Sequence, residues 1–102
     1  MRGRSAPAPH WWVYVVRTGG GELYTGIATD VERRVDAHAR GRGARYLRGR
    51  GPLELVYERR IGGRGLALRV ERGLKRRARA EKQRIVEAGM SRAALLRLLA
   101  LG

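Results

Sequence analysis

The sequence predicts an α+β fold: a small three-stranded antiparallel sheet flanked by helices, in the order ββαβαα. Three observations support this. Residues 11–29 form two β-rich runs separated by glycines, as in a hairpin. The apolar period then changes to that of a helix. A third β-rich run at 53–61 precedes a long helical segment, and a sheet covered by helices buries all of these apolar faces economically.

The hairpin opens the domain. The run "WWVYVVRT" at 11–18 is β-branched and aromatic, with apolar residues on both faces, which favours a central strand. The glycines of "GGGE" at 19–22 tolerate the backbone angles of a tight turn. The run "LYTGIAT" at 23–29 is then the second strand.

A helix is expected at 30–40. Thr29 and Glu32 form a capping-box pattern, and Asp30 adds negative charge at the helix start. Gly41 is expected to end the helix. Apolar residues recur every four positions on one helix face: Val31, Val35 and Ala39.

The second half contains a loop, a strand and helices. A Gly/Arg loop at 40–51 leads to the third strand at 53–61. The segment 66–89 has a helical apolar period, and a break near 77–80 is expected. Ser91 is a candidate N-cap for a last helix.

These elements suggest three parts. Residues 1–10 are expected to be a disordered basic tail and residues 11–89 the main domain. The helix within 90–102 is too apolar to remain exposed, so it packs on the domain or joins a second chain. We favour packing on the domain, and hence a monomer over a homodimer.

Composition restricts the function. The chain has 102 residues, no cysteine and a formal net charge of +14, carried almost entirely by arginine. This charge indicates a polyanionic partner, usually a nucleic acid. Disulfides and Cys-based zinc sites are excluded. No apolar run spans a bilayer, and the N-terminus lacks the apolar core of a signal peptide, so a cytoplasmic protein without membrane contact is expected.

Arg34 and His38 are candidates for a site on the predicted helix. They are four residues apart, hence neighbours beside the apolar face. The simpler interpretation is a half-buried histidine and an arginine that extends over the edge of the core.

Two tyrosines of the hairpin are also candidates. If Val16 pairs with Tyr24, Tyr14 pairs with Gly26, and the two rings share one face as diagonal neighbours, roughly 7–8 Å apart. A slip of one residue would place them on opposite faces. Gly26 leaves room for an approaching group. The alternative is that both rings simply pack in the core.

Glu71 is a candidate metal ligand. It lies among basic residues at the edge of the apolar stripe of its helix, so it is either a surface ion-pair partner or an inward-facing carboxylate. An inward carboxylate beside cations stays ionised. It then suits Mg²⁺, or Mn²⁺, because Mg²⁺ often takes only one or two protein carboxylates and keeps its waters.

Taken in order, these residues resemble the motifs of the GIY-YIG endonuclease superfamily, over roughly residues 11–85. The first motif reads "VYV" (13–15) and the second "YTG" (24–26), so both tyrosines and the second-motif glycine are kept. The segment 43–57 is similar to small stand-alone bacterial GIY-YIG proteins and to the nuclease subunit of the eukaryotic structure-specific endonuclease. Ile27 stands where the excinuclease branch has lysine, which argues against an excinuclease-type site.

The resemblance implies a phosphodiesterase with one divalent metal ion. Glu71 would bind the metal, Arg34 would hold the attacked phosphate, and Tyr14 or Tyr24 would activate the water. His38 would assist, as a histidine does in some branches of the family. A nearby arginine and metal would favour the phenolate of a tyrosine whose ordinary pKa is near 10.

The nucleic acid is expected to follow a basic surface on the Gly/Arg loop and the next helix, with Tyr46 stacking on a base. The alternative for the loop is a flexible solvated segment. The residues of this surface are Arg42, Arg45, Tyr46, Arg48, Arg50, Lys75, Arg76 and Arg79.

The sequence therefore predicts a metal-dependent DNA endonuclease, structure-specific and linked to repair or recombination. The main alternative is a non-catalytic DNA- or RNA-binding module with the same fold, and a small ribosomal-type basic protein is a third. Binding alone does not require the five candidate catalytic residues.

Overall fold

The computed structural model describes residues 9–102, so the basic tail expected at 1–10 lies almost wholly outside the described residues. The fold is α+β, as predicted. The described elements, in chain order, are β1 (Trp11–Arg17), β2 (Leu23–Ala28), α1 (Val31–Ala39), the short 3-10 helix η1 (Arg45–Leu47), β3 (Glu54–Gly62), α2 (Arg64–Lys75), α3 (Arg79–Ala88) and α4 (Arg92–Leu98).

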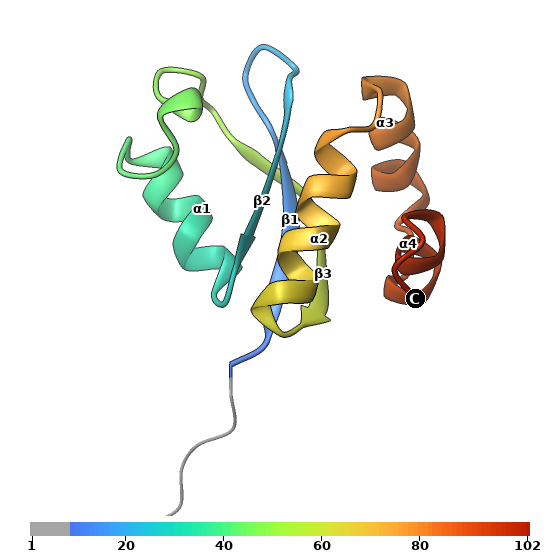
Figure 1. Cartoon of the computed structure of the whole chain (residues 1–102). Coiled ribbons are helices and arrows are strands. Elements are labelled where there is room, and N and C mark those ends of the chain that lie inside the picture. Colours follow the sequence, from blue (N-terminus) through green and yellow to red (C-terminus); the bar gives the residue numbers. More distant parts are fainter. Residues whose placement is uncertain (1–8) are drawn as a thin grey trace, which may run out of the picture.

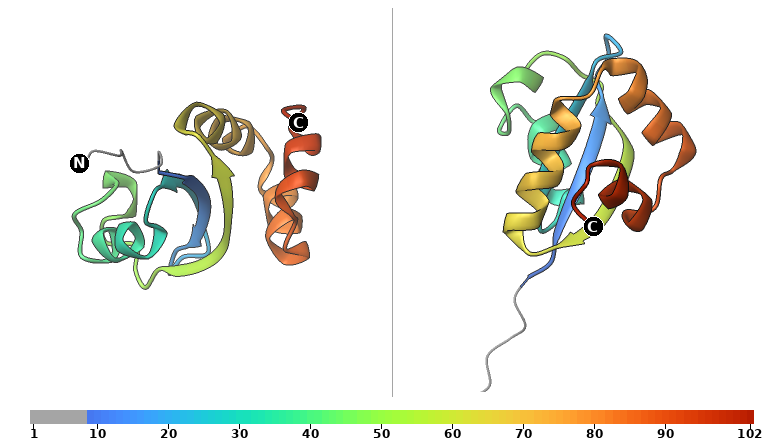
Figure 2. Two further views of the ribbon diagram at one scale, coloured as in Figure 1. Left: turned by 90° about the horizontal axis from the view of Figure 1, so that it is seen from below. Right: turned by 45° about the vertical axis from the view of Figure 1, so that its right-hand side comes forward.

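The three strands form one antiparallel sheet in the order β2-β1-β3. Helix α1 lies on one side of this sheet, and α2, α3 and α4 lie on the other (Figure 1). Figure 2 shows the strands between α1 and the α3–α4 pair. Among the described residues, no helix combines the length and apolar character needed to cross a membrane.

The hairpin has the predicted register. Val16 pairs with Tyr24, and Tyr14 pairs with Gly26. Successive side chains of a strand point to opposite faces, so Tyr14 and Tyr24 share the face that α1 covers. The arrangement on which the candidate site depends is therefore present.

Both faces of the central strand β1 are buried, which explains its continuous apolar run. Tyr14 and Val16 pack with Val31 of α1 in one apolar cluster. Val13 and Val15 belong to a second cluster on the opposite face, which is filled by α2, α3 and α4. A strand with two buried faces shows no polar alternation.

Helix α1 departs from the expectation in two details. Its N-cap is Asp30, not Thr29, because the Asp30 carboxylate accepts a hydrogen bond of 3.1 Å from the backbone N–H of Arg33. Its buried face ends at His38, which is 2 % exposed, whereas Ala39 is exposed. At about 100° per residue, position 38 returns closer to the direction of Val31 than position 39 does.

Three helices follow β3, since a break at 76–78 divides the long helical segment close to the expected position. Helix α2 begins at Arg64, two residues before the helical segment expected at 66–89. Ser91 is the N-cap of α4, as predicted, and accepts a hydrogen bond from the backbone N–H of Ala94. Leu95 of α4 is fully buried in the cluster on this side of the sheet.

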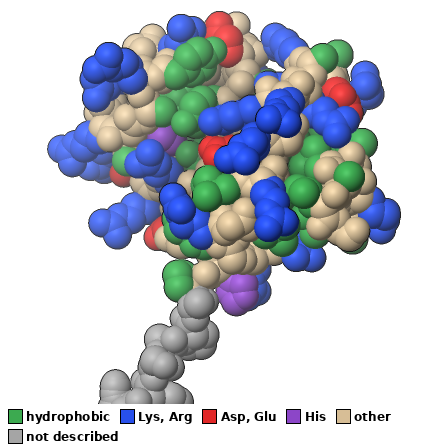
Figure 3. All heavy atoms as spheres, viewed as in Figure 1, with side chains coloured by type: hydrophobic (Ala, Val, Ile, Leu, Met, Phe, Trp, Pro, Cys, Tyr) green, Lys and Arg blue, Asp and Glu red, His purple; other side chains and the backbone are tan. Residues whose placement is uncertain are grey.

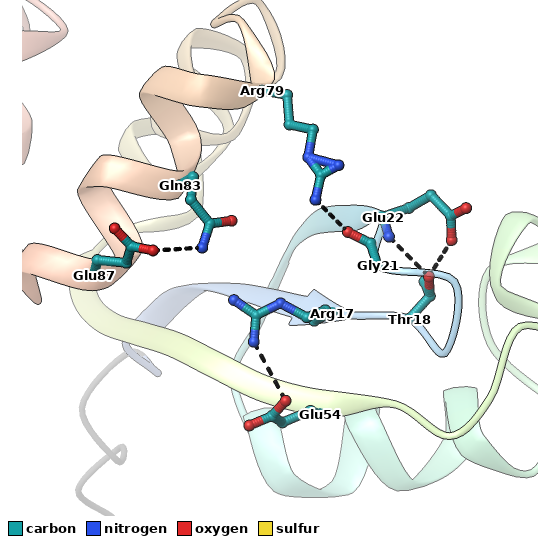
Figure 4. Close-up of polar contacts among 8 residues, drawn as sticks. All are labelled: Arg17, Thr18, Gly21, Glu22, Glu54, Arg79, Gln83 and Glu87. Atoms are coloured by element: carbon teal, nitrogen blue, oxygen red, sulfur yellow. Dashed lines mark hydrogen bonds and ion pairs between the residues drawn. The ribbon is translucent and has the colours of Figure 1, made fainter.

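The turn between β1 and β2 is stabilised by hydrogen bonds within the turn and by one from helix α3 (Figure 4). The Thr18 hydroxyl donates to the Glu22 carboxylate and accepts from the Glu22 backbone N–H at 3.1 Å. The Thr18 hydroxyl, as the main cause, lowers the pKa of Glu22. Arg79, at the start of α3, donates a hydrogen bond of 2.7 Å to the Gly21 carbonyl, which ties α3 to the hairpin.

Candidate active site

The candidate site lies beside the edge strand β2, where α1 and α2 approach it from the two sides of the sheet. The hairpin contributes two phenols, α1 an imidazole and a guanidinium, and α2 a carboxylate. The residues are Tyr14, Tyr24, Arg34, His38 and Glu71.

Tyr14 is buried, and its position depends on the glycine opposite. Its phenol ring lies across the backbone of β2, so a Cβ atom at Gly26 would collide with the Tyr14 hydroxyl. The missing side chain therefore leaves room for the Tyr14 ring itself. The hydroxyl lies 2.7 Å from Nε2 of His38, which joins β1 to α1.

The protonation of His38 follows from its two contacts. Its Nδ1 accepts a hydrogen bond of 2.9 Å from the backbone N–H of Ala44, so Nδ1 carries no proton. Burial, and to a smaller extent the charge of Arg34, lower the pKa of His38. The ring is therefore neutral near pH 7, and its single proton is on Nε2, which donates it to the Tyr14 oxygen.

Sequence reasoning missed the loop that holds His38. The Gly43–Ala44 backbone packs directly on the imidazole, and a Cβ atom at Gly43 would overlap Nδ1. The signal was the glycine-rich composition that follows the helix, which is interpreted from sequence alone as a nucleic-acid-binding loop or a flexible solvated segment. A glycine near a helix end also permits the close backbone approach seen here.

Tyr14 has a strongly perturbed hydroxyl. Burial, with smaller contributions from Tyr24 and Glu71, raises the pKa of Tyr14 to about 12, while Arg34 acts in the opposite direction. The same arginine lowers the pKa of His38, so its guanidinium influences both partners of the hydrogen bond. Arg34 is itself exposed, and its head is accessible to a ligand.

Tyr24 forms the outer wall of the site. Its ring meets His38 edge-on, with 5.6 Å between centroids, and stacks on Tyr46 at 6.0 Å with an angle of 18° between the planes. The ammonium of Lys75 lies 5.8 Å from the Tyr24 centroid. The phenol is thus held between the 3-10 turn and α2.

Glu71 faces the site and not bulk solvent. Its side chain is 19 % exposed and forms an ion pair of 3.4 Å with Lys75. Its charge contributes to the raised pKa of Tyr14, which requires the carboxylate to lie near that phenol. Within residues 9–102, no group of three or more His, Cys, Asp and Glu side chains forms a metal-binding cluster.

All the residues of the expected basic surface are exposed, and Figure 3 shows Lys and Arg side chains across this side of the molecule. Several of them have specific partners, among them Lys75, which pairs with Glu71. Arg50 lies 4.3 Å from the Tyr46 ring centroid and 3.8 Å from the Glu22 carboxylate. Arg79 is bound to the β1–β2 turn. Tyr46, which is 46 % exposed, stacks on Tyr24.

Comparison with known proteins identifies relatives of this chain. The chain is 51 % identical over 83 residues to a UPF0213 protein of Aeromonas salmonicida, a match that covers 81 % of this chain and 61 % of the relative. It is 48 % identical over 86 residues to the UPF0213 protein YhbQ of Escherichia coli K12, covering 84 % of this chain and 86 % of the relative. The chain thus spans about three fifths of the length of the Aeromonas relatives.

A solved structure and a family model also match this chain. The solution NMR structure of the UPF0213 protein BH0048 from Bacillus halodurans superimposes with a TM-score of 0.52 at 39 % identity, covering 78 % of this chain and 84 % of that one. The model of the GIY-YIG catalytic domain matches residues 10–84, which include all five residues of the candidate site. The chain therefore belongs to the GIY-YIG family.

Proposed function

We propose that this protein is a divalent-metal-dependent endonuclease that hydrolyses phosphodiester bonds in DNA, with a preference for branched structures of the kind processed in repair and recombination. The observation that carries the proposal is the hydrogen bond between Tyr14 and His38, with Arg34 and Glu71 acting on the same phenol. Packing alone does not require this combination of charged and titratable groups.

The tautomer of His38 favours Tyr14 over Tyr24 as the general base. Because Nε2 of His38 donates to the Tyr14 oxygen, the Tyr14 proton points away from the imidazole. Tyr14 can then pass through the phenolate form while His38 stabilises the negative oxygen. The Tyr14 proton is first lost to solvent water, and the phenolate then takes a proton from the attacking water, whose hydroxide forms the new bond to phosphorus. The bond from phosphorus to the leaving sugar oxygen breaks, and that oxygen takes a proton from solvent water.

Arg34 and Glu71 have separate roles. The exposed guanidinium of Arg34 binds the attacked phosphate and neutralises charge that develops on it. Glu71 is a single inward carboxylate, a donor set that fits Mg²⁺ or Mn²⁺ because these ions keep several waters. A metal ion held there supplies positive charge beside the phosphate and lowers the pKa of neighbouring oxygen acids.

The high pKa of Tyr14 in the free protein is also compatible with the main alternative, a nucleic-acid-binding module without catalysis. At about 12, the phenol is fully protonated at neutral pH. General-base catalysis by Tyr14 would require this pKa to fall in the complex with substrate and a bound metal ion, whereas a pure binding protein requires no such change.

The test is incubation of labelled branched and single-stranded DNA, and of RNA, with the protein in Mg²⁺, Mn²⁺ or EDTA. Fragments that form only with metal support the proposed nuclease. A gel shift without fragments in either metal would show that the protein binds but does not cleave. Preferential cleavage of RNA would overturn the choice of DNA.

A further inference from the structure

We propose that the groove between α1 and α2 binds an unpaired nucleotide of DNA next to the bond that is cut. This inference rests on the proposed function, since it specifies which DNA the same site accepts. The groove has a volume of about 570 Å³, which lies in the range of pockets that hold small ligands. Its lining comes from both helices and from strands β1 and β2.

The groove shares Arg34 with the candidate active site. The same side chain acts on Tyr14 and His38. On α2, two residues that line the groove are followed by the site carboxylate and by the lysine that pairs with it. They are spaced four, three and four apart, so they lie on one helix face. These residues are Arg64, Leu68, Glu71 and Lys75.

The lining chemistry fits a nucleotide. Trp11, Ile27 and Leu68, all half-buried, provide an aromatic and aliphatic surface for a base. The guanidinium of Arg64 lies 5.6 Å from the Trp11 ring centroid, so stacking and charge are available at one place. Arg33, Arg34 and Arg64 outnumber Asp30, the acid in the lining, and a positive balance favours a phosphate.

The groove requires an unpaired nucleotide because a base within a duplex is already stacked and paired. Only a single strand, a flap or a frayed end exposes a base face to Trp11 without the cost of extrusion from the helix. The substrate class is therefore DNA in which unpaired nucleotides adjoin a duplex.

The test measures binding in EDTA by fluorescence anisotropy, with a labelled duplex that carries a short single-stranded overhang and with the blunt duplex of the same length. Two changes address the groove. The double variant Arg33→Gln with Arg64→Gln removes two exposed cations of the groove. Trp11→Leu removes the stacking surface, and Trp11→Phe is the conservative variant that keeps an aromatic ring. The matched control is Arg84→Gln with Arg97→Gln, exposed arginines on α3 and α4.

We expect wild-type protein to bind the overhang at least tenfold more tightly than the blunt duplex, since stacking of one base is worth about that factor. The Arg33/Arg64 variant and Trp11→Leu should lose most of this preference, whereas Trp11→Phe and the control should keep it. Circular dichroism and thermal unfolding check that each variant folds, and the arginine variants remain informative if Trp11→Leu does not.

Equal losses on overhang and blunt duplex would overturn the proposal, because the groove would then be only part of a general phosphate surface. Tighter binding of the same overhang made of RNA would overturn the assignment to DNA. Since no cleavage is measured, a preference for overhangs in a protein that never cuts would support this inference while refuting the proposed nuclease. Metal-dependent cleavage in the test of the proposed function, together with equal binding of overhang and blunt duplex here, would refute this inference while supporting the nuclease.

Discussion

The hydrogen bond between Tyr14 and His38 connects a strand to a helix and orders a loop at the same time. One ring nitrogen of His38 meets the Tyr14 hydroxyl, and the other meets the Ala44 backbone. Buried polar groups that satisfy each other in this way are costly to disrupt. The geometry of the site therefore depends on a single imidazole.

Arg34→Ala and Glu71→Ala should each reduce metal-dependent cleavage by at least about a hundredfold, because loss of one group that stabilises transition-state charge typically has this effect. Arg34 is exposed and Glu71 is only half-buried, so the melting temperature should change little. Single-turnover cleavage and thermal unfolding measure the two effects. Arg84→Ala and Glu87→Ala, exposed residues of α3, are the matched controls, and undiminished cleavage in either site variant would mean that the site is elsewhere.

Stability should depend on pH through His38. Burial lowers the pKa of His38 in the folded state below the ordinary value of 6.5. The unfolded chain therefore binds the proton first as the pH falls below about 6.5, and the folded state loses stability, with a slope of at most about 1.4 kcal/mol per pH unit. Urea unfolding between pH 7.5 and 5.5 measures this slope.

The variant His38→Asn removes this titration and should be less stable than the wild type at pH 7.5, while its stability should fall less steeply as the pH decreases. An identical slope in the two proteins would show that another group titrates in this range.

Residue types and spacing identified all five side chains of the candidate site, but not their environments. His38 was expected at the edge of the core and is buried. The difference comes from the loop backbone that covers the imidazole, and contacts of this kind depend on a loop conformation that local sequence does not determine.

At the level of secondary structure, the two faces of the β1–β2 hairpin organise the molecule. The predicted register places Gly26 opposite Tyr14, and a one-residue slip would put Thr25 or Ile27 there, where a Cβ atom would collide with the Tyr14 ring. The break between α2 and α3, at 76–78, lies close to the one expected near 77–80. The cap of α1 was not predictable, since Thr29 and Asp30 are both good N-cap residues.

Gly26→Ala should displace the Tyr14 ring or destabilise the hairpin, because the new Cβ atom would collide with the Tyr14 hydroxyl. We expect a loss of about 1–3 kcal/mol in the free energy of unfolding together with reduced cleavage. Gly65→Ala is the control, since its Cβ would meet no atom within 4 Å in α2 and alanine favours a helix. Thermal unfolding should show opposite shifts for the two, and a neutral Gly26→Ala would contradict this packing.

Asp30→Ala should cost about 1 kcal/mol of folding free energy through loss of the N-cap of α1. Thr29→Ala should cost much less, because the backbone N–H of Arg33 is bound by Asp30. Urea denaturation of the two variants measures the difference. A larger loss for Thr29→Ala would restore the capping box suggested by the sequence.

At the scale of the whole molecule, the net charge of +14 acts together with the fold. The loop at 40–51, with its exposed arginines, follows the C-terminal end of α1, and the groove between α1 and α2 includes Arg33 and Arg34 of the same helix. A nucleic-acid strand that follows both would pass over Arg34. Composition predicted the polyanionic partner but could not predict its path, since the path depends on how the loop and α2 flank the edge of β2.

The salt dependence of DNA binding tests the loop part of this path. Arg42→Gln with Arg48→Gln should flatten the slope of log K against log salt concentration by about 1.4–1.8, because each phosphate contact contributes about 0.7–0.9. The double variant Arg84→Gln with Arg97→Gln should leave the slope unchanged. Equal slopes in the wild type and the loop variant would place the DNA elsewhere.

The most direct measurement is the cleavage of a branched DNA by wild-type protein and by Tyr14→Phe, each in Mg²⁺ and in EDTA. The proposed mechanism predicts fragments from the wild type in Mg²⁺ alone, and at least about a hundredfold slower cleavage by Tyr14→Phe, which keeps the ring but removes the hydroxyl. Fragments at the wild-type rate from Tyr14→Phe, or wild-type cleavage that persists in EDTA, would contradict it.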